Sequence, residues 1–170
     1  KAEIKLLNKI AIGSSARDVD TARFLDFLGV DNYTLTGCPA TFAFDKPFTF
    51  KDDGAVVISF PPVRFKKHRF MFYRLISSIK KYIDYCLVNG LRSVLSCQDS
   101  RDVDFAKAIQ KEGVEIFYSE KPSDYYEFYE KARLVIGFRL HAAIISFSLG
   151  TPFIPIYFDM RGIAFAETYE

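Results

Sequence analysis

The chain has 170 residues, 49% of them hydrophobic, and its 23 Lys and Arg against 21 Asp and Glu give a formal net charge of +2. This composition predicts one or two folded domains with a hydrophobic core and excludes a disordered chain. The small net charge argues against a nucleic-acid-binding protein, because no basic block is interleaved with stacking aromatic residues. Cys38, Cys86 and Cys97 lie far apart. They indicate neither a disulfide framework nor a zinc site, and a reducing cytoplasm fits them best.

Residues 1–44 are expected to form a β-α-β unit. Residues 9–16 and 32–37 are the predicted strands, and residues 20–30 are the predicted helix, which Gly29 ends. The chain begins at Lys1 in a charged stretch without a signal-peptide pattern, so we expect it to be cut from a longer protein. Residues 45–54 contain Pro47, two adjacent Asp and Gly54, and they form the predicted linker between two domains.

Residues 55–170 alternate strands and helices more regularly. The predicted strands are residues 55–60, 92–97, 114–119, 134–138 and 152–158. The predicted helices are residues 66–90, 100–113 with Ser100 as the N-cap, 123–132, 142–150, and a last one that begins at 159. Continuous apolar strands need burial on both sides. The pattern therefore predicts an α/β domain, a Rossmann-like parallel sheet with helices on both faces.

The apolar run at residues 134–159 contains Arg139 and His141. Both follow a predicted strand and precede a predicted helix, which is where ligands bind in open α/β sheets. If this junction is extended, a spacing of two residues sends both side chains to the same side. Arg offers a planar fork for a carboxylate or phosphate, and His can transfer a proton near neutral pH. The pair indicates a site for an anionic substrate, and equally a structural ion pair of Arg139 beside a helix-capping His141.

Two longer motifs resemble one known family. Residues 136–167, IGFRLHAAIISFSLGTPFIPIYFDMRGIAFAE, resemble the C-terminal signature of the polysaccharide pyruvyl transferase family, and residues 16–42, ARDVDTARFLDFLGVDNYTLTGCPATF, resemble an earlier motif of that family. The motifs stand in the family's order, and the resemblance spans roughly the whole chain. It implies the C-terminal half of a two-domain GT-B-like fold. Residues 1–44 would then be a remnant of the N-terminal Rossmann-like domain, and residues 55–170 the C-terminal Rossmann-like domain.

The resemblance implies a reaction as well. Members of this family transfer a pyruvyl group from phosphoenolpyruvate to a pair of sugar hydroxyls, forming a pyruvate ketal on a polysaccharide or its lipid-linked precursor. By this resemblance Arg139 would clamp the anionic groups of the donor, His141 would be the general acid or base, and no cofactor would be needed. We expect a cytoplasmic enzyme, at the inner face of the cell membrane where its acceptor is lipid-linked, and inactive as this chain alone.

Four further residues are candidate substrate ligands. Arg64 follows the strand at residues 55–60, with a solvated loop position as its alternative. Arg17 and Asp18 follow the first predicted strand, where the resemblance would place them facing the substrate, and a salt bridge or helix cap is as good an interpretation of Asp18. Arg161 matches a position that is often basic in the family, and surface charge is its alternative.

Other functions remain open from the sequence. A nucleotide-sugar glycosyltransferase or epimerase of GT-B-like fold is the nearest rival, although residues 142–149 contain no Asp or Glu to hold a ribose. A non-catalytic interaction domain is another, since 18 Phe and 10 Tyr exceed what a core requires. A basic helix at residues 66–90 would suit peripheral membrane contact. The spacing of His68 and His141 predicts no metal site, and Cys38 has no nearby base in the sequence to make it a nucleophile.

Overall fold

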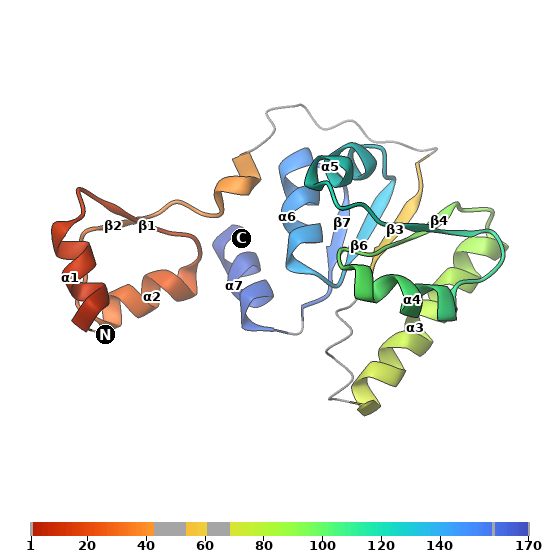
Figure 1. Ribbon diagram of the computed structural model, residues 1–170, viewed down its shortest axis with the longest axis horizontal. Helices are drawn as coiled ribbons and strands as arrows, with labels where there is room; N and C mark the ends of the chain where they lie inside the picture. The colour runs from red at the N-terminus through yellow and green to blue at the C-terminus, as the bar shows by residue number, and fades with distance from the viewer. Residues whose placement is uncertain (1, 43–53, 61–68, 158, 170) are drawn as a thin grey trace. The chain divides into compact units, whose positions relative to one another are not determined.

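The structure, a computed structural model, describes residues 2–42, 54–60, 69–157 and 159–169 (Figure 1). The chain divides into two compact units. One consists of Lys1–Ala43 together with Tyr157–Glu170, and the other of Phe44–Ile156. We call them the split unit and the sheet unit.

The sheet unit contains a five-stranded parallel sheet. Its strands are β3 (Val56–Ser59), β4 (Ser93–Ser96), β5 (Val114–Phe117), β6 (Leu134–Gly137) and β7 (Phe153–Pro155), in the order β5-β4-β3-β6-β7. All four strand pairings are parallel. β3 and β4 are buried at every position, as their continuous apolar sequences predict. The predicted parallel sheet is confirmed.

Helices cover both faces of this sheet. They are α3 (Arg69–Val88), α4 (Ser100–Ile109), α5 (Pro122–Glu130) and α6 (Leu140–Leu149). Figure 1 shows α3 and α4 on one face and α5 and α6 on the other. Alternate strand residues enter the two layers, so Val57, Val94 and Val135 pack with Tyr129 of α5 and Ala142 of α6. The architecture is Rossmann-like.

Two helix starts differ from the sequence-based prediction. Asp99, rather than Ser100, is the N-cap of α4, and its carboxylate accepts the Arg101 backbone N–H. The helix predicted at residues 142–150 begins earlier, so His141 lies in its first turn and only Arg139 is extended, with φ −117° and ψ 137°. The expected extended segment from Arg139 to His141 is therefore not present, whereas the direction of the two side chains stays a prediction.

The split unit contains a small β-α-β motif. Its elements are α1 (Ala2–Ile10), β1 (Ser14–Ala16), α2 (Val19–Phe27), β2 (Tyr33–Leu35), a 3-10 helix (Pro39–Phe42) and α7 (Met160–Tyr169). β1 and β2 pair in parallel. The first half of the strand predicted at residues 9–16 was wrong, because the preceding residues form α1 and the strand begins only at Ser14. No residue of α1 is buried.

The split unit brings the last helix to the N-terminal segment. The Val19 backbone N–H donates to Thr168 Oγ1 at 3.1 Å, and the Cys38 backbone N–H donates to the Tyr169 hydroxyl at 2.7 Å. The sequence-based division had assigned α7 to the second domain instead. Most of the predicted linker, residues 45–54, lies outside the described residues. Within the described parts of the chain, no helix has the length and apolar character needed to cross a membrane.

Candidate functional site

The central strand of the sheet, β3, and its neighbour β6 form a topological switch point. They are neighbours, yet α3 follows β3 on one face of the sheet and α6 follows β6 on the other. Connections that diverge in this way leave room beyond the carboxyl ends of the strands, where open α/β sheets bind their ligands. Arg139 and His141 come directly after β6 and therefore stand at this point of the sheet.

Arg139 is anchored to two neighbouring strand ends. Its Nε donates to the carbonyl of Phe60, directly after β3, at 3.1 Å. Its Nη2 donates to Oδ2 of Asp102, in the first turn of α4 after β4. The two side chains are 15% and 2% exposed. The structural ion pair, one of the two interpretations of Arg139 from the sequence, is present.

The contacts described for Arg139 involve Nε and Nη2 of its guanidinium. An arginine has five N–H donors, and the Phe60 carbonyl and Asp102 engage two of them. Among the contacts of the described residues, three N–H donors of Arg139 therefore have no protein acceptor. This geometry keeps Arg139 as a candidate ligand for an anion. The hydrogen bonds to the Phe60 carbonyl and Asp102 fix the orientation of its guanidinium.

His141 lies in the first turn of α6 and is exposed. The N-cap residue of this helix is Arg139, whose side chain does not cap it, while its carbonyl accepts from Ala142 N at 3.0 Å and Ala143 N at 3.3 Å. The backbone N–H groups before Ala142 precede these bonds and carry the positive end of the helix dipole. His141 therefore stands where an anion is favoured and where a proton can exchange with a ligand.

Cys97 lies beneath this site but is not a candidate nucleophile. It is fully buried, and burial together with the charge of Asp102 raises the pKa of its thiol to about 12, against an opposing effect of Arg139. A thiol with this pKa stays protonated at neutral pH, and the thiolate is the nucleophilic form. Cys97 is part of the core.

Sequence reasoning missed a row of hydrogen-bonded polar side chains, Ser96, Gln98 and Tyr129, at the carboxyl end of β4. The Tyr129 hydroxyl, fully buried, lies 3.1 Å from Ser96 Oγ and accepts from Gln98 Nε2 at 3.4 Å. Burial raises the pKa of Tyr129, so the hydroxyl stays protonated and available as a donor. The sequence carried a signal for this row, because β3 and β4 are apolar strands that both end in Ser.

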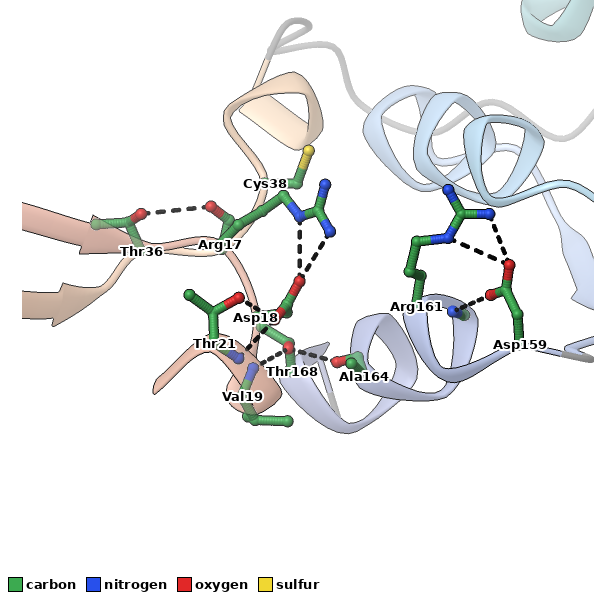
Figure 2. Close-up of polar contacts among 12 residues, drawn as sticks. Arg17, Asp18, Val19, Thr21, Thr36, Cys38, Asp159, Arg161, Ala164 and Thr168 are labelled. Carbon is green, nitrogen blue, oxygen red and sulfur yellow. Dashed lines mark hydrogen bonds and ion pairs between the residues drawn. The ribbon is translucent and has the colours of Figure 1, made fainter. Parts of the chain in front are cut away.

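Asp18 and Arg17 lie at the carboxyl end of β1 in the split unit (Figure 2). Asp18 is the N-cap of α2, and its carboxylate accepts from Thr21 N at 2.9 Å and Thr21 Oγ1 at 2.6 Å. It also accepts from Arg17 Nε and Nη2 at 3.1 and 3.0 Å. Burial alone would raise the pKa of Asp18, but the hydrogen bonds from Thr21 and Arg17 lower it overall. Both alternatives considered for Asp18, the salt bridge and the cap, are present.

Arg161 and Asp159 form a similar pair at the start of α7. Arg161 donates from Nε and Nη2 to Asp159 Oδ2 at 3.2 and 2.7 Å, and its side chain is 65% exposed. Asp159 Oδ1 accepts the Gly162 backbone N–H at 3.0 Å. Figure 2 shows each of the two guanidinium groups, those of Arg17 and Arg161, turned toward its own aspartate. Each of the two arginines has N–H donors that no described residue accepts.

The predicted site residues thus fall into two groups. Arg139 and His141 belong to the sheet unit, whereas Arg17, Asp18 and Arg161 belong to the split unit. Arg64 lies outside the described residues. Asp102 and Asp159, which hold two of the arginines, were not predicted. The described part of the chain contains no cluster of three or more His, Cys, Asp or Glu placed to bind a metal ion.

The comparison with known families assigns the chain. A family model described as polysaccharide pyruvyl transferase matches residues 3–159. The match is broader than the C-terminal signature, because it covers residues 16–42 in full and residues 136–167 as far as 159, while α7 lies beyond it. No curated protein matches the chain. With most of its 170 residues covered by the model, the chain belongs to the polysaccharide pyruvyl transferase family, a family of transferases.

Proposed function

We propose that this protein transfers the pyruvyl group of phosphoenolpyruvate to two hydroxyls of a saccharide, forming a pyruvate ketal. Family membership indicates pyruvyl transfer to a polysaccharide in general. The observation that carries the finer proposal is the position of Arg139 and His141 at the switch point of the sheet, beside the first turn of α6. This position offers N–H donors for an anion and an exposed imidazole within the same few residues.

The proposed reaction makes defined demands on the protein. Two bonds form between the central carbon of the donor and the sugar oxygens, and its bond to the phosphate oxygen breaks. One hydroxyl proton ends on the vinyl carbon, which becomes a methyl group, and the other leaves with phosphate. We assign the donor's anionic groups to Arg139 and the α6 N-terminus, and the proton transfers to His141 as general acid or base.

The split unit would supply further substrate contacts. Arg17 and Arg161 are the proposed ligands there, each oriented by an aspartate and each with N–H donors left over. Asp18 would act by orienting Arg17. A GT-B-like fold, with Arg64 as a further substrate ligand and no cofactor, is part of the same proposal.

A nucleotide-sugar transferase or epimerase is the second candidate. Enzymes that grip a ribose need a hydroxyl acceptor, and α6 contains neither Asp nor Glu. The absence of such an acceptor favours phosphoenolpyruvate, which has no ribose. A non-catalytic interaction domain is set aside, because the family is one of transferases.

A lipid-linked acceptor would bring the protein to the cytoplasmic face of the cell membrane. α3 exposes the basic side chains of Arg74, Lys80 and Lys81. Basic residues on an exposed helix face favour anionic lipid surfaces. We therefore include peripheral membrane contact in the proposal.

Titration calorimetry with phosphoenolpyruvate, and separately with a uridine diphosphate sugar, tests the donor. We expect phosphoenolpyruvate to bind, and Arg139→Lys to weaken that binding at least tenfold, because an ammonium lacks the planar fork. Arg92→Lys is the matched control. Arg92 pairs with Glu115, and the Arg92 side chain is 58% exposed. It precedes β4, at the amino ends of the strands, whereas Arg139 follows the carboxyl end of β6. Tighter binding of the nucleotide sugar, unaffected by Arg139→Lys, would exclude the proposal in favour of the second candidate.

His141→Gln tests the catalytic role separately. The side chain is exposed, so the substitution should leave folding and donor affinity nearly unchanged. Turnover with a saccharide acceptor, measured on the longer protein from which we expect this chain to be cut, should fall by about 10²–10⁴, the usual contribution of a general acid or base. Full turnover in this variant would remove His141 from the mechanism while leaving the donor assignment intact.

A further inference from the structure

Asp102 is the most deeply buried carboxylate that contacts the candidate site. The residue is 1% exposed, and it lies in the first turn of α4, three residues after the N-cap Asp99. Its backbone N–H donates to the Asp99 carbonyl at 2.9 Å, which fixes the start of the helix. A carboxylate removed from water in this way needs compensation, and Arg139 provides a charged partner.

The contact links three neighbouring strands of the sheet. Asp102 follows β4, the Phe60 carbonyl follows β3, and Arg139 follows β6. Nε and Nη2 are therefore fixed by two groups on separate elements. A planar guanidinium held at two of its nitrogens cannot rotate about its terminal bonds, so its remaining N–H donors keep a single direction.

From this geometry we propose that Asp102 is a positioning residue that orients Arg139 for the anionic donor. The inference rests on the proposed function, since it takes the donor to be phosphoenolpyruvate. Asp102 itself contacts Arg139, not the donor. Binding a ligand to a preoriented side chain avoids the entropy cost of fixing that side chain, so positioning by Asp102 should appear as donor affinity.

Charge and positioning predict opposite effects in the Asp102→Asn variant. If Asp102 only neutralised Arg139, its removal would leave an uncompensated positive charge and would tighten the binding of an anion. If Asp102 positions Arg139, its removal frees the guanidinium and weakens that binding. Asp102→Glu sharpens the distinction, because it retains the charge and displaces the carboxylate by one methylene.

Asp99→Asn is the matched control. Asp99 lies in the same turn, forms an exposed pair with Arg101, and Asn is as good an N-cap as Asp. Circular dichroism and thermal unfolding would establish that every variant is folded. Calorimetry would then measure the dissociation constant for phosphoenolpyruvate, and ¹⁵N NMR would follow the Arg139 Nε–H signal, assigned by its loss in Arg139→Lys.

We expect Asp102→Asn to raise the dissociation constant at least tenfold and Asp102→Glu at least threefold, with Asp99→Asn within twofold of the starting protein. The Arg139 Nε–H signal should be sharp in the unaltered chain and in Asp99→Asn, and broadened in Asp102→Asn. If Asp102→Asn does not fold, the test rests on Asp102→Glu, whose dissociation constant should rise at least threefold. Unchanged or tighter binding of phosphoenolpyruvate in a folded Asp102 variant would overturn the positioning role of Asp102. It would leave the assignment of phosphoenolpyruvate as the substrate intact. Failure of the unaltered chain to bind phosphoenolpyruvate would instead overturn the proposed function, and this inference with it.

Discussion

At the scale of residues, the candidate arginines share one arrangement. Arg17, Arg161 and Arg139 each bond an aspartate at the start of a helix: Asp18 at α2, Asp159 at α7 and Asp102 at α4. A carboxylate is stabilised at this end of a helix by the free backbone N–H groups and the dipole. The arginine side chains of the Arg17 and Arg161 pairs are 51% and 65% exposed, so these ion pairs contribute little to folding, and their effect is to orient a cation.

The ionisation of Asp18 makes the free energy of unfolding depend on pH. Burial alone would raise its pKa, but hydrogen bonds from Thr21 and the charge of Arg17 lower the pKa below the ordinary value of 3.8. A lowered pKa means that the stabilisation by Asp18 is complete above about pH 3.8 and is lost as the pH falls through the folded-state pKa. Asp18→Ala should lower the free energy of unfolding by about 1 kcal/mol at pH 7, the usual effect of an N-cap. Urea unfolding between pH 7 and pH 2.5 should show this difference shrinking in acid.

Asp20→Ala is the control for this measurement. Asp20 lies two residues further on, in the first turn of α2, and makes only a surface pair with Arg23 among the contacts described. Its removal should change the free energy of unfolding by less than about 0.5 kcal/mol. A difference between Asp18→Ala and the unaltered chain that stays constant down to pH 2.5 would contradict a role for the ionised carboxylate.

At the scale of elements, hydrophobic periodicity predicted most of the structure. The five strands and four helices of the sheet unit all lie within the predicted segments or extend them by one or two residues. The errors were at helix starts, where a few side-chain hydrogen bonds decide. Asp99 and Ser100 are both good N-cap residues, and only the geometry selects Asp99. α1 was missed, and its last two residues, Lys9 and Ile10, were assigned to the strand predicted at residues 9–16.

Gly37 is a second point at which an element depends on one residue. It follows β2 with φ +77°, and a Cβ atom there would lie 2.5 Å from the Tyr169 hydroxyl of α7. Gly37→Ala would therefore combine an unfavourable backbone with displacement of a hydroxyl that bonds the Cys38 N–H. We expect a loss of about 2–3 kcal/mol in the free energy of unfolding of the split unit. Chemical denaturation, followed by a fluorescent or NMR probe in α7, would measure it.

Gly29 provides the matched control. It also has a positive φ, +67°, but open space around its Cβ position. Gly29→Ala should lower the free energy of unfolding by only about 1 kcal/mol, from the backbone conformation alone. Equal losses in the two variants would show that the contact with Tyr169 does not matter.

At the scale of the whole molecule, the candidate site was only partly predictable. The Arg139 and His141 motif, its position after a strand and the family could be read from the sequence, because each depends on local order along the chain. The partners of Arg139 could not, since Phe60 and Asp102 are 79 and 37 residues away and meet it only through the strand order. The association of α7 with the N-terminal segment was unpredictable for the same reason.

The two units should differ in their ability to fold alone. The sheet unit has five strands with helices on both faces, whereas the split unit has two strands and a core cluster of Ala16, Leu25, Leu28 and Val30. A two-stranded sheet with so small a core is marginal in water. We therefore expect residues 44–156 to fold as a separate chain with a cooperative thermal transition. Residues 1–43 joined to 157–170 by a short Gly-Ser linker should lack one.

Circular dichroism and ¹H–¹⁵N NMR of the two pieces would test this expectation. Val135→Asp in the sheet-unit piece is the control, because Val135 is fully buried in the core on the α5 and α6 face and an unpaired charge there should abolish the transition. A non-cooperative piece 44–156 would mean that its core depends on the split unit. A cooperative one would place Arg139, Asp102 and the first turn of α6 on a self-sufficient scaffold, since all the contacts described for Arg139 lie within the sheet unit.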